Sequence, residues 1–266
     1  MGTPISLVSA STPPKTKQIG NAIIHLEPRI SANQLAQFAI SDPAKQETIV
    51  RNAKKVLTTR VTNYQPARNA IPKCHTLKGL DADSVIKHAV RMETTDFSDL
   101  FERKCNNLSA ASLRMASQLV SQIDCEGARI SAPARGFDHL IIEGVRVSIQ
   151  PEIVISFAHR GATRFGGVMF NFSKTESSSL ENGNGRYHAG DYAATLVFLM
   201  LQTHFGAKGG PRNANCLAVD VYQQKVFAAP SSYKTILKNI EASCRSVARQ
   251  WEVAELANDL EGEEFF

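Results

Sequence analysis

The sequence predicts an α/β fold in which a mixed central sheet is flanked by helices and preceded by an N-terminal helical extension. Apolar residues recur at helical spacing in residues 30–57 and 84–123, whereas strand-like alternation begins after Gly136. The rest of the chain follows the order three or four strands, helix, strand, strand, helix. This order indicates one mixed sheet with helices on its faces. With 266 residues, of which 43% are hydrophobic, the chain can bury a continuous core.

Composition divides the chain into four segments. Residues 1–28 are rich in Ser, Thr, Pro and Lys, which is typical of a flexible tail rather than of a signal peptide. Residues 29–75 are expected to form a basic helical module, and residues 76–257 the α/β core. Residues 258–266 are expected to form an acidic tail.

Two helix starts are visible in the basic module. Ser31 is followed three residues later by Gln34, which is the spacing of a capping box. Asp42 is followed by Pro43, so a second helix can begin with an acidic cap and with proline in its first turn. Residues 63–79 contain two prolines and a glycine and are expected to be a connection.

Two more helices and a hairpin are expected in the next part of the chain. Residues 84–105 and 109–123 carry apolar side chains at helical spacing. Residues 137–150 alternate between apolar and polar side chains on both sides of the dipeptide Glu143-Gly144. This pattern predicts two antiparallel strands joined by a tight turn.

The C-terminal half completes the predicted sheet. Residues 152–158 and 166–174 are expected to form two strands, and residues 187–205 a helix that is apolar on several faces and therefore buried. Residues 215–230 then predict strand, turn and strand. A last helix is expected over residues 230–256.

Positive charge is concentrated near the N-terminus. Residues 29–73 contain eight basic and two acidic residues, a balance of +6 that exceeds the +5 of the whole chain. Lys54 and Lys55 fall outside the apolar stripe of their predicted helix, which makes them candidates for contact with a phosphate backbone. The alternative is an ordinary solvated helix face.

Cysteine usage and hydropathy favour a cytoplasmic protein. The five cysteines are scattered and include no CxxC pair, so a reducing compartment is expected. The longest strongly apolar run, residues 193–201, is about half of the roughly 20 residues that cross a bilayer. We therefore expect no membrane partner.

Three short segments carry a resemblance to a known superfamily. "QPEIVI" places Glu152 at the head of a strand, "FNFSK" ends the next strand with Lys174, and "HAGDY" places His188 and Tyr192 four residues apart on the following helix. With this order the chain resembles the PD-(D/E)XK nucleases, in particular their RecB-like branch, over about residues 108–256. The resemblance implies a restriction-endonuclease-like core and nucleic acid as the partner, with DNA favoured.

The same resemblance implies a divalent-metal site for phosphodiester hydrolysis. Glu152 would hold Mg²⁺ or Mn²⁺, and Lys174 would orient the nucleophile or stabilise the transition state. The superfamily pattern has a second acid two residues before the lysine, where this chain has Phe172. Asp191 is the best substitute. The candidate catalytic residues are therefore Glu152, Lys174 and Asp191, and the candidate metal ligands are Glu152 and Asp191.

Six residues are candidates for contact with the substrate. Arg160 and Arg164 lie in the predicted turn between two strands, where they could touch a nucleic-acid backbone. His188 and Tyr192 match the helical part of the superfamily pattern. Lys54 and Lys55 complete this set of candidates.

Three hypotheses follow from the sequence. The first is a metal-dependent nuclease whose second acid has moved to Asp191, Glu176 or Asp138. The second is a catalytically inactive protein of the same fold that binds nucleic acid or protein, with Glu152 and Lys174 serving as ordinary strand-end residues. The third is a protein-interaction domain that engages its partner through the acidic tail.

Overall fold

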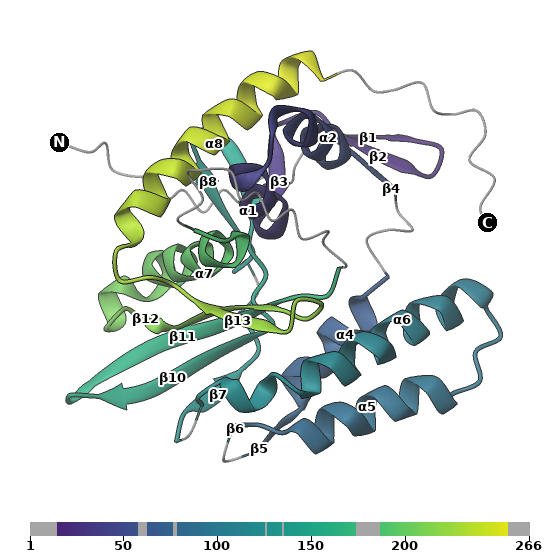
Figure 1. Cartoon of the computed structure of the whole chain (residues 1–266), viewed down its shortest axis with the longest axis vertical. Coiled ribbons are helices and arrows are strands. Elements are labelled where there is room, and N and C mark those ends of the chain that lie inside the picture. Colours follow the sequence, from purple (N-terminus) through teal and green to yellow (C-terminus); the bar gives the residue numbers. More distant parts are fainter. Residues whose placement is uncertain are drawn as a thin grey trace.

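The computed structural model describes residues 15–57, 63–76, 79–125, 127–134, 136–173 and 187–254. These residues form a mixed α/β structure with helices on both faces of a central sheet, which confirms the expected fold class (Figure 1). The described helices are α1 (Ala32–Ile40), α2 (Pro43–Lys54), α4 (Gln65–Ala70), α5 (Ala82–Thr94), α6 (Leu100–Ser117), α7 (Ala189–Phe205) and α8 (Tyr233–Val253).

The central sheet has five strands in the order β13-β12-β11-β10-β7. Their bounds are β7 (Arg129–Ser131), β10 (Ile153–His159), β11 (Ala162–Asn171), β12 (Pro211–Asp220) and β13 (Lys225–Ala228). β11 and β12 are parallel and are connected through α7, whereas the other neighbours are antiparallel. The sheet is therefore mixed, because a parallel pair needs a long crossover and an antiparallel pair only a short turn.

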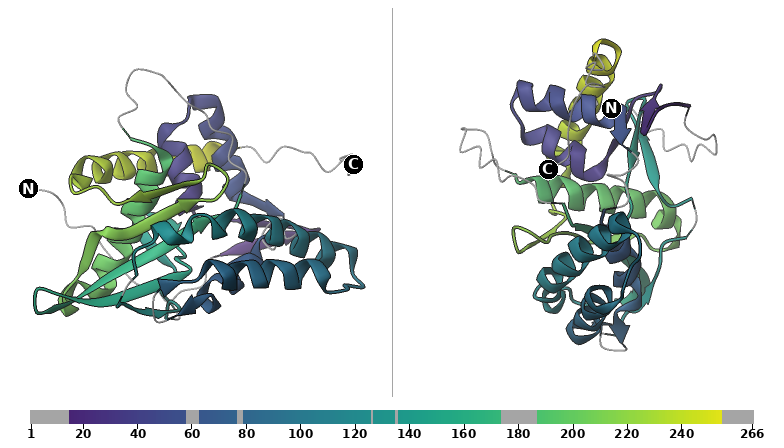
Figure 2. Two further views of the ribbon diagram at one scale, coloured as in Figure 1. Left: turned by 60° about the horizontal axis from the view of Figure 1, so that its bottom comes forward. Right: turned by 90° about the vertical axis from the view of Figure 1, so that its right-hand side faces the viewer.

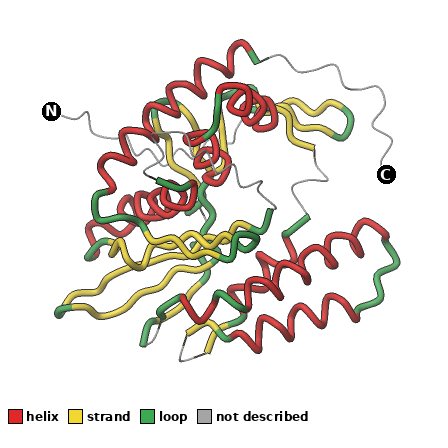
Figure 3. The backbone as a smooth tube through the Cα atoms, viewed as in Figure 1, coloured by secondary structure: helices red, strands yellow, loops and turns green. Residues whose placement is uncertain are grey.

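Alternation along the strands divides the core into two layers. Val154 and Met169 point into a cluster with α1, α7 and α8, whereas Ile153 and Phe170 point into a second cluster with α4, α5 and α6. The two further views in Figure 2 show α8 and the α5–α6 pair on opposite sides of the sheet. Figure 3 shows the same division, with helices gathered in two groups around the strands.

The basic N-terminal helices belong to the first of these layers. Ser31 and Gln34 form the expected capping box at the start of α1, and Asp42 accepts from the backbone of Lys45 at the start of α2. The strand β3 (Arg29–Ser31) pairs in parallel with β9 (Val145–Ser148), which itself pairs with β8 (His139–Ile142). The helices α1 and α2 therefore pack on the core rather than standing apart from it.

Two segments differ from the sequence-based expectation. The strands β1 (Thr16–Ile19) and β2 (Ala22–His25) lie within the expected tail and pair with β4 (Lys55–Leu57). The expected connection contains α4 and a short 3-10 helix, and the two-residue strands β5 (His75–Thr76) and β6 (Gly79–Leu80) follow. The hairpins β1–β2 and β5–β6 pair locally, whereas β4 pairs with the distant β2 and α4 packs on the distant α6.

The helical boundaries between α5 and α6 were also predicted wrongly. The structure ends α5 at Thr94 and starts α6 at Leu100, so the break lies earlier than the expected one near residue 107. Asp99 determines this boundary, because its carboxylate accepts from the backbone N–H groups of Phe101 at 2.6 Å and Glu102 at 3.2 Å. Within the described residues, no helix is both long and apolar enough to span a bilayer.

Candidate functional site

Glu152 lies immediately before β10 and is buried, with 3% of its side chain exposed. Both of its carboxylate oxygens accept hydrogen bonds. The guanidinium of Arg68 donates to Oε1, and the backbone N–H of Phe170 donates to Oε2 at 2.7 Å. The backbone N–H of Glu152 donates to the carbonyl of Val168 at 2.9 Å, which ties the residue to β11. The carboxylate is therefore held between the sheet and α4.

Arg68 is the partner that sequence reasoning did not identify. It extends from α4, in a segment expected to be a connection, and its Nη2 also lies 3.4 Å from the carbonyl of Phe170. Its guanidinium carbon lies 5.8 Å from the centre of the Phe172 ring, a cation–π contact. Pro66 in the first turn of α4 was the available signal, because proline is favoured at a helix start.

The ionisation of Glu152 reflects this environment. Burial raises the pKa of its carboxyl to about 7, and the charge of Arg68 together with the hydrogen bond from Phe170 opposes that rise. Charge in the protein interior is costly. The Arg68–Glu152 ion pair is tolerated there because both oxygens of the carboxylate accept hydrogen bonds. An isolated carboxylate in this place would take up a proton.

A cleft of about 520 Å³ lies beside the Arg68–Glu152 pair. We call it the basic cleft. Its walls come from β3, α1, α2 and β4 on one side and from α4 and the end of β11 on the other. The charged side chains among the described lining residues are Arg29, Lys55 and Arg68, and the lining includes no acidic residue. Uncharged polar side chains such as Asn52 and Gln150 line much of the rest, together with apolar and aromatic ones that include Met169, Tyr64 and the buried Phe172.

Like charges meet at one wall of the basic cleft. Arg29 on β3 is paired in register with Arg146 on β9. The pKa of Arg29 is lowered mainly by burial and, to a smaller extent, by the positive charge of Arg146. The negative charge of Asp138 partly offsets this effect. The wall therefore carries more positive than negative charge, which favours an anionic ligand.

The two lysines of the predicted set have different surroundings. Lys55 lines the basic cleft. Lys54 instead donates through Nζ to the carbonyls of Trp251 and Ala254, at 2.8 and 3.0 Å, at the C-terminal end of α8. A lysine in this position stabilises a helix end by satisfying its last carbonyls. Lys55 is thus part of the candidate site, and Lys54 supports the fold beside it.

The predicted arginines lie at the opposite end of the sheet from Glu152. Arg160 is in the turn that joins β10 to β11, and a strand rise of about 3.3 Å per residue separates it from Glu152 by about 26 Å. Arg164 donates to the carbonyl of Gly209. The pKa of the nearby His159 is lowered, first by slight desolvation and then by the positive charges of Arg212, Arg160 and Arg164. These arginines form a basic group separate from the basic cleft.

The predicted residues of α7 have structural partners. Asp191 Oδ2 accepts from the backbone N–H of His188 at 2.7 Å, and the two residues form a capping box at the start of the helix. The hydroxyl of the buried Tyr192 accepts from Asn239 of α8 at 3.0 Å. The helix start is thus explained without a ligand.

The residues expected to hold a metal do not form a ligand cluster in the described part of the chain. No group of three or more His, Cys, Asp or Glu side chains suited to a metal ion occurs among those residues. Glu152 is occupied by Arg68 and by the Phe170 N–H group, and Asp191 by the cap of α7. Lys174 and Glu176 lie outside the described residues, so their role remains a prediction.

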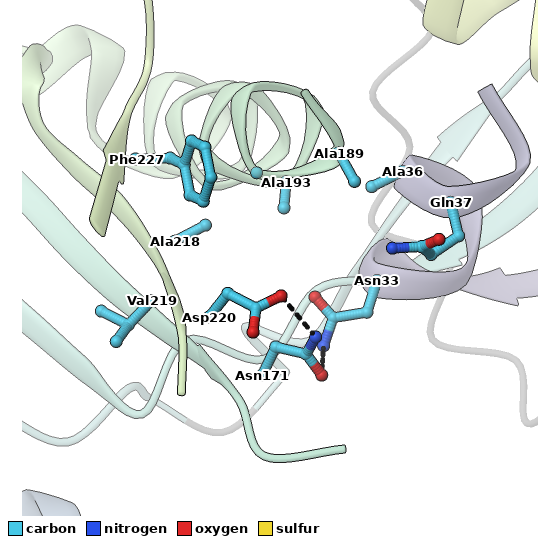
Figure 4. A pocket seen from close by; sticks show the side chains of 11 residues that line it. Asn33, Ala36, Gln37, Asn171, Ala189, Ala193, Ala218, Val219, Asp220 and Phe227 are labelled. Carbon is cyan, nitrogen blue, oxygen red and sulfur yellow. Dashed lines mark hydrogen bonds between the residues drawn. The ribbon is translucent and has the colours of Figure 1, made fainter. Parts of the chain in front are cut away.

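A second, smaller hollow was not expected from the sequence. It lies at the carboxyl ends of β11 and β12, next to α1 and the start of α7 (Figure 4). Asn171 donates to Asp220 at 3.4 Å and accepts from Asn33 at 3.5 Å. With a volume of about 20 Å³ it has room for about one water molecule. We interpret it as a polar link between α1 and the sheet.

No family model matches the chain, and no curated protein matches it.

Proposed function

We propose that this chain is a catalytically inactive protein of the nuclease fold that binds nucleic acid in the basic cleft. The observation that carries the proposal is the Arg68–Glu152 pair. Both oxygens of the candidate metal-binding carboxylate are engaged, one by a guanidinium and one by a backbone N–H group. A hard divalent cation would need those oxygens as ligands and would be repelled by the positive charge of Arg68. The chain has a fixed cation there instead.

The order of the strands supports kinship with the restriction-endonuclease-like core. β10 and β11 form an antiparallel pair, β12 runs parallel to β11, and α7 connects the parallel pair, whereas the expected hairpin β8–β9 lies in a separate sheet with β3. Glu152 precedes β10 and is bonded to β11, and the resemblance expects its acid at this place, after the hairpin and at the head of the next strand. Phe170 and Phe172 fill the neighbouring positions on β11 and its end with apolar rings.

The lining of the basic cleft supports a nucleic-acid ligand. Arg29, Lys55 and Arg68 offer cations to phosphates, and Tyr64 offers an aromatic face to a base. The volume of about 520 Å³ is that of a small-ligand pocket, which suits part of a single strand better than a duplex. We therefore propose single-stranded nucleic acid, with DNA favoured over RNA.

Binding of a fluorescently labelled oligothymidine, measured by anisotropy across a salt series, tests the proposal. Replacing Lys55 by Gln should weaken binding and lower the salt slope by about 0.7, because one phosphate contact is lost. Lys87→Gln is the matched control, since Lys87 is exposed on α5 and does not line the basic cleft. Binding that is insensitive to salt, or equal losses in the two variants, would contradict the proposal.

A metal-dependent nuclease is the second candidate. The observation in its favour is the place of Glu152 at the head of β10 against β11. It predicts cleavage of single- or double-stranded DNA or RNA with Mg²⁺ or Mn²⁺, and loss of that cleavage in both Glu152→Gln and Lys174→Ala. If neither metal supports cleavage of any of these substrates, this candidate is eliminated.

A further inference from the structure

We propose that the acidic segment 255–266 binds in the basic cleft and competes there with nucleic acid. This inference rests on the proposed function, because it names the competitor at the same site. It follows from three observations, namely the chemistry of the segment, its point of attachment and its reach.

The segment and the basic cleft are chemically complementary. Residues 255–266 contain no basic residue but two adjacent phenylalanines and five acidic residues, which are Glu255, Asp259, Glu261, Glu263 and Glu264. The basic cleft has three cations and, beside them, apolar side chains such as Ile30, Leu57 and Met169. Carboxylates next to aromatic rings offer the same two features as the phosphates and bases of a single strand.

The attachment point lies beside the basic cleft. Lys54 binds the carbonyls of Trp251 and Ala254, so the residue that precedes the acidic segment is fixed to the end of α2. Lys55, the next residue after Lys54, lines the basic cleft. The segment therefore starts within a few residues of the cations that it would bind.

The reach of the segment is sufficient, and its tethering makes a weak contact effective. Twelve residues span up to about 40 Å when extended. A short tether gives an effective concentration on the order of 1 mM. Suppose that the untethered segment binds the basic cleft with a Kd of about 0.1 mM. The tethered segment then occupies the cleft about 10 times as often as the cleft is empty. The apparent affinity for nucleic acid falls about 10-fold as a result.

The test compares the full chain with a chain that ends at Ala254, using labelled oligothymidine and anisotropy. At low salt the truncated chain should bind about 10-fold more tightly, and the difference should shrink as salt rises. Removal of negative charge anywhere could tighten binding, so a matched pair of variants is needed. Glu263→Gln/Glu264→Gln should tighten binding, whereas Asp83→Asn/Glu102→Gln, on the exposed starts of α5 and α6, should not.

A second measurement tests the contact itself. A labelled peptide of residues 255–266 should bind the truncated chain, and Lys55→Gln should weaken this binding whereas Lys87→Gln should not. Equal affinity of the full and truncated chains for the oligonucleotide, or a peptide that does not bind, overturns the inference. Peptide binding without oligonucleotide binding by either form rejects the proposed function and leaves the contact standing.

Discussion

Replacing Arg68 by Met gives the sharpest test of the buried pair. The change keeps most of the apolar stem over Phe172 but removes the guanidinium that donates to Glu152. Among the described residues, the carboxylate then keeps the hydrogen bond from the backbone N–H of Phe170. It must remain charged without its counter-charge or take up a proton, and both outcomes lower the stability of the folded chain at alkaline pH.

The expected loss is about 3 kcal/mol at pH 8. Breaking a buried ion pair by removing one partner costs about 3–5 kcal/mol. The lower end applies because the Arg68 side chain is 27% exposed and because Phe170 still satisfies one carboxylate oxygen. For a chain of this size, about 3 kcal/mol corresponds to a fall of about 6–12 °C in the melting temperature.

The loss should depend on pH in a defined direction. Burial raises the pKa of Glu152 from an ordinary 4.5 to about 7, so between these values the folded chain keeps a proton that the unfolded chain has released. This contribution to stability is complete below pH 4.5 and is lost as the pH rises toward 7. Without Arg68 the folded pKa rises further, because the guanidinium lowers it. The free energy of unfolding that Arg68→Met loses should thus be only about 1 kcal/mol at pH 5, because Glu152 is neutral there in both the unchanged chain and the variant.

Urea unfolding at pH 5 and pH 8 measures both quantities. The double variant Arg68→Met/Glu152→Gln is the control, because a neutral amide can still accept from Phe170 and needs no counter-charge. It should recover most of the stability that Arg68→Met loses at pH 8. The same loss at both pH values, or a double variant no more stable than the single one, would refute the argument.

Three further predictions concern the fold around the site. Lys54→Met should lower the free energy of unfolding by about 1–2 kcal/mol, because the last carbonyls of α8 lose a charged donor, whereas Lys87→Met should change it little. Gly190→Ala should lower the melting temperature clearly, because a methyl group at position 190 overlaps the ring of Phe227. Gly206→Ala should not lower it, because a methyl group at position 206 meets only the flexible side chain of Gln202. All five thiols are buried, so a thiol-reactive disulfide reagent at pH 8 should label the chain only after urea is added, and rapid labelling of the folded chain would contradict the structure.

The sequence predicted those elements whose signals are local. The capping box of Ser31 and Gln34 starts α1 where expected, because both partners lie within one helical turn. The hairpin of β8 and β9 turns at Glu143 and Gly144, both of which have positive φ angles, as a tight turn requires. The short apolar runs at residues 152–158 and 166–174 likewise predicted β10 and β11, since such a run depends only on neighbouring residues.

The candidate site was predictable only in part. Glu152 was identified by its place before a strand, and it does lie beside the basic cleft through Arg68. Asp191 was expected to approach it, but a carboxylate at a helix start has a nearer use in its own N-terminal N–H groups. Arg160 and Arg164 were proposed as substrate contacts from their place in a turn between strands, and the extended strand carries that turn to the other end of the sheet from Glu152.

The sequence by itself determined the α/β class, the strands from β8 to β13 and the concentration of basic residues before position 75. Only the tertiary structure decided which charges meet. Arg68 and Glu152 are 84 residues apart in sequence, and Lys54 and Trp251 are 197 apart. Such partners depend on how α4 and α8 pack against distant parts of the chain. No local pattern encodes them, because their attraction acts only once folding has brought the groups together in a low-dielectric environment.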